Sequence, residues 1–180
     1  MATQSGATLW FSQALFASLG LFAVLAAMLP LGLSANAIPM PDLVFILAVA
    51  WVIRRPVAAP LGLVAAIAII ADILLMRPIG LWALVMIFSV EAVRARRWTI
   101  REHMFLVEWA IFATLFAVSL VATSIILGLA FAPRPGAYIM FTYFLSTVIA
   151  YPIVVGLLQW VLGVKRPKVA HRTIGPGQVS

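Results

Sequence analysis

The sequence predicts an all-α integral membrane protein with six transmembrane helices. The first observation is composition: 65% of the 180 residues are hydrophobic and 9% are charged, whereas soluble domains contain about 45–50% apolar and about 25% charged residues. The second is that the apolar residues fall into separate segments, with arginine clusters between several of them. In addition, the sequence contains no cysteine, which excludes disulfides and thiolate chemistry.

Most of the expected segments are long enough to cross the membrane, which needs about 20 apolar residues for 30 Å of hydrocarbon. The second segment is short. It either crosses by snorkelling Arg54 and Arg55 to the interface or re-enters the membrane packed inside the bundle. The expected segments are 9–33, 41–53, 57–76, 78–93, 104–131 and 138–163. The transmembrane domain then covers residues 1–163, and we expect residues 164–180 to form a disordered basic cytoplasmic tail.

The first two segments have recognisable ends. The N-terminal segment follows no basic region and is longer than a signal-peptide core, so we interpret it as a retained helix. The second segment opens at Pro41 and Asp42, where the carboxylate can cap the helix and complement its dipole. The turn Arg54-Arg55-Pro56 closes it.

Asp72, near the end of the third segment, is the first clue to function. An ionised side chain inside a bilayer costs about 2.5–3.5 kcal/mol on insertion scales, so it needs a partner. Asp72 shares a helix face with Ala65 and Ala68, and small faces favour a position inside the bundle. Arg77 is the expected partner, either in a structural pair that fixes the following turn or in a site that binds a ligand or partner protein.

A second small-residue face of the third segment carries Ala58, Gly62 and Ala66 at four-residue spacing. Gly62 and Ala66 point about 80° or more away from Asp72, given about 100° of rotation per helical residue. Small residues allow transmembrane helices to approach closely. This face therefore either binds a partner helix from outside or packs inside the bundle.

The last two segments and the fourth contribute further polar groups. Tyr143, Thr147 and Tyr151 recur every four residues and form one stripe. Such hydroxyls usually bond to neighbouring helices for about 0.6–2 kcal/mol, and a ligand pocket is the alternative. Glu91 and Glu108 can each pair with an arginine.

The distribution of lysine and arginine predicts the orientation. Ten of the twelve basic residues fall on one side, and only Arg77 and Arg134 fall on the other. By the positive-inside rule the ten are cytoplasmic, and six spans place both termini there. If the second segment re-enters instead, the N-terminus lies outside, and the charge count fits both alternatives. The ten residues are Arg54, Arg55, Arg94, Arg96, Arg97, Arg101, Lys165, Arg166, Lys168 and Arg172.

Several function classes are disfavoured. The net charge of +7 sits at segment ends and forms no continuous basic face, so we expect no nucleic-acid partner. The two histidines, His103 and His171, lie far apart, and we expect no metal or cofactor. No combination of nucleophile, base and oxyanion donors can be assembled, which favours a non-enzymatic protein.

The stretch PDLVFILAVAWVIRRP and the following helix, which ends AIIADILLMRPIG, resemble the rod shape-determining protein MreD family of bacteria. Gly62, Asp72 and Gly80 are similar to the family's pattern of a glycine, an acid about ten residues later and a glycine opening the next helix. Alanines stand where many members have further glycines before the acid. These motifs cover about a third of the chain, and length, span number and the basic tail agree over the rest.

This resemblance implies a protein of the bacterial inner (cytoplasmic) membrane with both termini cytoplasmic. It implies a fold like the substrate-binding S-components of energy-coupling-factor transporters. It also implies a non-enzymatic scaffold of the cell-elongation (rod) complex that binds MreC and helps to regulate peptidoglycan synthesis and cell shape. Further implied partners are RodA, a class B penicillin-binding transpeptidase and, through the complex, MreB.

The alternative function is a small-molecule-binding membrane subunit like an S-component. Such a subunit would use Asp72, Arg77 and the stripe of Tyr143, Thr147 and Tyr151 as an outward-facing pocket. A scaffold would instead use the small faces of its helices, because the loops are short. Membrane lipids are partners in either case.

Overall fold

The computed structural model describes residues 6–29, 39–102 and 104–161, and all regular structure in these ranges is helical. The predicted tail and the expected end of the first segment at residue 33 lie outside the described residues. The helices are α1 (Gly6–Met28), α2 (Leu43–Arg54), α3 (Leu61–Leu74), α4 (Leu81–Glu102), α5 (Phe105–Leu129) and α6 (Ala137–Val161), with a short 3-10 helix, η1 (Pro56–Ala58), before α3.

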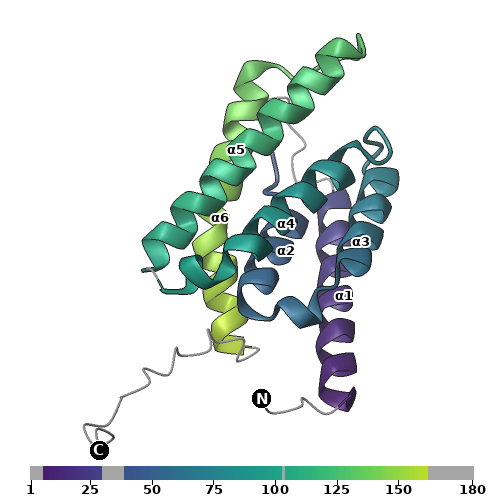
Figure 1. The fold of residues 1–180 in the computed structure, drawn as a ribbon. Helices are drawn as coiled ribbons and strands as arrows, with labels where there is room; N and C mark the ends of the chain where they lie inside the picture. Colours follow the sequence, from purple (N-terminus) through teal and green to yellow (C-terminus); the bar gives the residue numbers. More distant parts are fainter. Residues whose placement is uncertain (1–5, 30–38, 103, 162–180) are drawn as a thin grey trace, which may run out of the picture.

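Consecutive helices run in opposite directions through one bundle (Figure 1). The start of α1, the α2–α3 connection and the end of α6 lie at one end, which we call the Arg54 end. The α3–α4 turn and the α5–α6 loop lie at the opposite end, which we call the Arg77 end. The predicted all-α membrane bundle is confirmed, and the alternation matches the order of the six predicted segments.

α2 is the central helix of the bundle. It packs against α1, α4 and α6, and every residue from Val44 to Arg54 is buried. Its 12 residues reach only about 18 Å at 1.5 Å per residue. Because its residues are buried, this short segment lies inside the bundle and its neighbours shield it from lipid. The predicted snorkelling of Arg54 is wrong, because this side chain is buried and paired with an acid.

Within the described ranges, three helices, α1, α5 and α6, are long and apolar enough to cross a membrane. The third segment, predicted as one long helix over 57–76, is divided: η1 and Pro60 turn the chain, and α3 itself has 14 residues, or about 21 Å. Proline starts helices but cannot continue them, which explains the break. α4 continues to Glu102, beyond its predicted end at residue 93.

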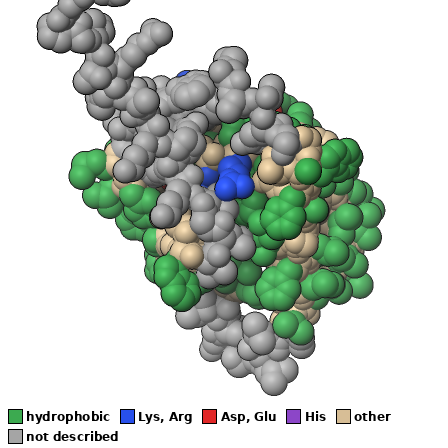
Figure 2. All heavy atoms as spheres, turned by 90° about the horizontal axis from the view of Figure 1, so that it is seen from below, with side chains coloured by type: hydrophobic (Ala, Val, Ile, Leu, Met, Phe, Trp, Pro, Cys, Tyr) green, Lys and Arg blue, Asp and Glu red, His purple; other side chains and the backbone are tan. Residues whose placement is uncertain are grey.

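The outside of the bundle is apolar, as a lipid-facing surface requires. Large side chains such as Trp10, Phe22 and Phe88 are exposed on the helices. Figure 2, which views the molecule from the Arg54 end, shows hydrophobic side chains around the rim and arginine near the middle. Inside, the ring of Phe45 on α2 lies 5.9 Å from that of Phe112 and 5.1 Å from that of Phe116, so aromatic contacts join α2 to α5.

Candidate functional site

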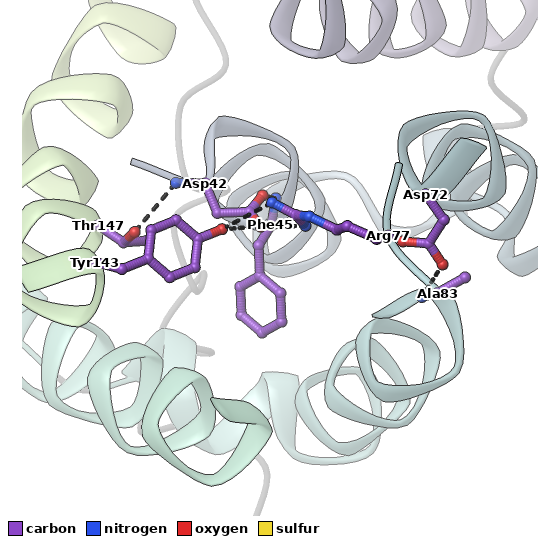
Figure 3. Close-up of polar contacts among 7 residues, drawn as sticks. All are labelled: Asp42, Phe45, Asp72, Arg77, Ala83, Tyr143 and Thr147. Atoms are coloured by element: carbon purple, nitrogen blue, oxygen red, sulfur yellow. Dashed lines mark hydrogen bonds and ion pairs between the residues drawn. The ribbon is translucent and has the colours of Figure 1, made fainter. Parts of the chain in front are cut away.

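Asp42 is the centre of a polar network at the Arg77 end (Figure 3). Its Oδ1 accepts a hydrogen bond of 2.9 Å from the backbone N–H of Phe45, which confirms the predicted cap of α2. Its Oδ2 accepts one of 2.7 Å from the Tyr143 hydroxyl and lies 3.5 Å from Nη1 of Arg77. Its backbone N–H donates to Oγ1 of Thr147 at 3.1 Å. One carboxylate thus joins α2, α6 and the α3–α4 turn.

Asp72 is fully buried and points into the bundle, as predicted. Its Oδ2 accepts hydrogen bonds from the backbone N–H groups of Gly80 at 2.9 Å and Ala83 at 3.2 Å. Figure 3 shows the second of these. These amides belong to the start of α4, where N–H groups lack helical partners and the helix dipole favours a negative charge. Gly80 has a φ of 85°, a left-handed conformation that favours glycine. Asp72 and Gly80 together fix the α3–α4 turn.

The predicted side-chain pair between Asp72 and Arg77 is wrong. The guanidinium of Arg77 contacts Asp42 and the Tyr143 hydroxyl, the latter at 3.3 Å, and its Cζ lies 5.5 Å from the ring centroid of Trp82. The physical reason is that helix packing places Asp42 and Tyr143 around the guanidinium, while Oδ2 of Asp72 accepts from the amides of Gly80 and Ala83; Oδ1 of Asp72 is buried with no hydrogen-bond partner among the described residues. The Pro-Asp pair at the start of α2 predicts the cap. That Asp42 is also the partner of Arg77 depends on how the helices pack.

A second buried network lies at the Arg54 end. Nη1 of Arg54 donates to Oε1 of Glu108 at 2.9 Å, and both side chains are fully buried. The Tyr151 hydroxyl donates to the same oxygen at 2.6 Å. Arg54 also donates to the carbonyl of Ala50 at 3.1 Å, while its Nε and Nη2 have no hydrogen-bond partner in the part of the chain that the structure describes. The predicted pairing of Glu108 with an arginine is confirmed, and it links α2, α5 and α6.

The Arg54-Arg55-Pro56 turn is held by α4. Arg94 donates to the carbonyl of Pro56 at 3.2 Å and to that of Ala59 at 2.8 Å. Arg94 also forms the predicted ion pair with Glu91, at 2.8 Å. Arg55 is exposed. The turn therefore has one buried arginine, which packs inside, and one at the surface.

The hydroxyl stripe of α6 is divided between the two networks. Tyr143 and Thr147 contact Asp42, whereas Tyr151 contacts Glu108. Each hydroxyl therefore makes a contact to another helix, as we expected of polar groups in a membrane bundle. The stripe does not form one pocket.

A cavity of about 680 Å³ opens at the Arg77 end, between the start of α4, the end of α5 and the start of α6. Arg77 and Tyr143 line it, together with mainly apolar side chains. Asp72, Thr147 and Tyr151 do not line it. The pocket predicted from all five residues is therefore wrong in composition, because the turn at Gly80 draws Asp72 towards α4 and the Asp42 network holds Thr147.

The second small face of α3 points away from the bundle at two of its three positions. Gly62 and Ala66 are exposed, and a Cβ added at Gly62 would meet no atom within 4 Å. Ala58 is buried, because it belongs to η1 and not to α3. The outward alternative is therefore correct for Gly62 and Ala66, and the inward alternative is correct for Ala58.

Comparison with known proteins found no match to this chain among family models, curated proteins or solved structures. The observations that bear on function are therefore structural. They are the two buried networks, the cavity at the Arg77 end and the exposed small face of α3.

Proposed function

We propose that the protein is a non-enzymatic membrane scaffold of the bacterial cell-elongation complex, which binds MreC and helps to regulate peptidoglycan synthesis and cell shape. The observation that supports this most directly is the exposed face of α3 formed by Gly62 and Ala66. Small residues four apart let a second transmembrane helix approach the backbone closely, which is how helices associate in lipid. A single partner helix, such as the membrane anchor of MreC, fits this face.

The residues that carry the resemblance to MreD also position this face. Asp42 and Arg54 hold the two ends of α2, and Asp72 with Gly80 fixes the turn that joins α3 to α4. These residues make contacts inside the bundle. We infer that these contacts hold α3 in a fixed position. The proposed role extends to RodA, a class B penicillin-binding transpeptidase and, through the complex, MreB.

The proposed location is the bacterial inner membrane, with both termini and the Arg54 end in the cytoplasm. Cysteines at Met76 and Phe131, both almost fully exposed at the Arg77 end, should react with an impermeant maleimide added to intact spheroplasts. Cysteines at Arg55 and Arg96, which are exposed near the other end, should react only after permeabilisation. Since the chain has no native cysteine, each signal reports one site. The reverse labelling pattern would refute the proposed orientation.

The interface is tested by Gly62→Leu and Ala66→Leu. Each substitution is expected to reduce MreC co-purification about fivefold, since a close helix contact is worth about 1 kcal/mol. Thermal stability in detergent should stay unchanged, because no atom lies near a Cβ at Gly62. The measurement is the ratio of MreC to the tagged protein after mild detergent extraction.

Gly156→Leu is the matched control, because Gly156 is also an exposed helical glycine with open space, but on α6. It should leave MreC recovery unchanged. Equal loss in all three variants, or full recovery in both α3 variants, would rule out the α3 interface.

A second candidate function is a small-molecule-binding subunit like the S-component of an energy-coupling-factor transporter. The cavity of about 680 Å³ favours it, because ligand sites usually measure about 300–1,000 Å³. The same mild extraction discriminates the two functions. Recovery of MreC supports the scaffold, whereas recovery of an ATPase module or a soluble vitamin-like ligand supports the transporter subunit.

A further inference from the structure

We propose that the cavity at the Arg77 end binds one anionic phospholipid, with an acyl chain against its apolar walls and the phosphate near Arg77. The site goes beyond the scaffold function and does not depend on it. Two properties of the cavity lead to this ligand: its apolar walls and the positive charge that is accessible beside it.

The walls fit an acyl chain. Leu81, Leu120, Leu127, Ile139 and Met140 line the cavity. Water would find few hydrogen-bond partners against these side chains. Ile139 lines the cavity and is also 54% exposed on α6, so the cavity is continuous with the lipid-facing surface. A chain can therefore enter from the membrane without crossing water.

The charge around the cavity favours an anion. The Arg77 side chain is 30% exposed, and among the described residues it forms an ion pair only with Asp42, at 3.5 Å, through an oxygen that already accepts a 2.7 Å bond from Tyr143. Arg134 lies between the lining residues Pro133 and Pro135, is exposed, and has no ion pair with any described acid. The two acids of this end, Asp42 and Asp72, are buried, so the charge that a ligand can reach beside the cavity is positive. Arginine binds phosphate well because its donors match the phosphate oxygens.

Native mass spectrometry of the intact protein tests the site. The protein is incubated with phosphatidylglycerol or with phosphatidylcholine of identical acyl chains, and the bound fraction is measured after detergent removal in the gas phase. One phosphatidylglycerol should stay bound, and phosphatidylcholine should be retained about tenfold less, because it lacks a net charge. Equal retention of the two lipids would overturn the proposal, as would a retained soluble ligand in place of lipid.

Two variants with matched controls locate the binding. Leu127→Trp fills the cavity and should reduce retention of phosphatidylglycerol about tenfold, whereas Ile153→Trp on the exposed face of α6 should not. Arg134→Gln removes an exposed charge at the cavity without disturbing the core, and Arg55→Gln removes an exposed charge at the other end. Retention that is unchanged in Arg134→Gln and in a folded Leu127→Trp would place the lipid elsewhere and overturn the proposal. If Leu127→Trp does not fold, Arg134→Gln decides alone.

Discussion

Glu108→Leu is expected to lower the free energy of unfolding by about 3–5 kcal/mol, because it leaves the fully buried Arg54 without its counter-charge. Among the described residues, the carbonyl of Ala50 alone would still accept from this guanidinium. The Tyr151 hydroxyl would also lose its acceptor at Oε1. Unfolding in mixed detergent micelles, followed by circular dichroism, measures the loss.

Removing the whole network should restore most of this stability. In the triple variant Arg54→Met, Glu108→Leu, Tyr151→Phe no charge of this network remains, and apolar replacements of buried ion pairs are often neutral or stabilising. Glu91→Leu is the control, because it removes an acid at the same end from a partly exposed pair, which is worth about 0–1 kcal/mol. A Glu108→Leu variant as stable as Glu91→Leu would contradict the burial of the Arg54 pair.

Asp42→Ala should cost about 2–4 kcal/mol, the second largest effect. It removes the cap of α2, worth about 1 kcal/mol, and the acceptor shared by Tyr143 and Arg77, which is a charge-assisted contact worth about 1.5–3 kcal/mol. Because Asp42 caps α2, the N-terminus of this helix should be the first part to lose protection from hydrogen exchange. Hydrogen exchange at Phe45, whose amide bonds to Asp42, reports this directly.

A pair of double-mutant cycles separates the two acids of the Arg77 end. Arg77→Gln combined with Asp42→Ala should show a coupling energy of about 0.5–3 kcal/mol, since the two side chains are in contact. Arg77→Gln combined with Asp72→Ala should show a smaller one, because Asp72 bonds to the amides of Gly80 and Ala83 instead. A larger coupling to Asp72 would contradict the contacts of this network.

The two networks have a common consequence for function. They fasten the opposite ends of α2 to α6, through Thr147 and Tyr143 at one end and through Tyr151 and Glu108 at the other. The buried charged residues therefore stabilise the packing of the helices. The exposed face of α3 and the cavity at the Arg77 end are not used in this way, and both proposals rest on them.

Several features follow from the sequence by itself, because they depend on composition or on neighbours along one helix. The apolar content and the spacing of basic residues determine an all-α membrane bundle with alternating helices. The Pro-Asp pair predicts the cap of α2, and a three-residue spacing predicts the ion pair of Glu91 with Arg94. The small residues beside Asp72 predict its inward position. The cap, the ion pair and the position of Asp72 each involve groups within about two turns of one helix, whereas the membrane bundle follows from composition.

Other features were decided only by the tertiary structure, because they join residues far apart in the chain. The partner of Arg77 is Asp42, 35 residues earlier, and Tyr143 reaches the same oxygen across 101 residues. Which acid each base meets depends on how the helices are rotated and packed against each other, and helix periodicity does not determine this. The division of the hydroxyl stripe, the burial of Arg54 and the shape of the cavity follow from the same packing. The bundle's helices are local properties of the sequence, whereas its polar contacts are properties of the packed molecule.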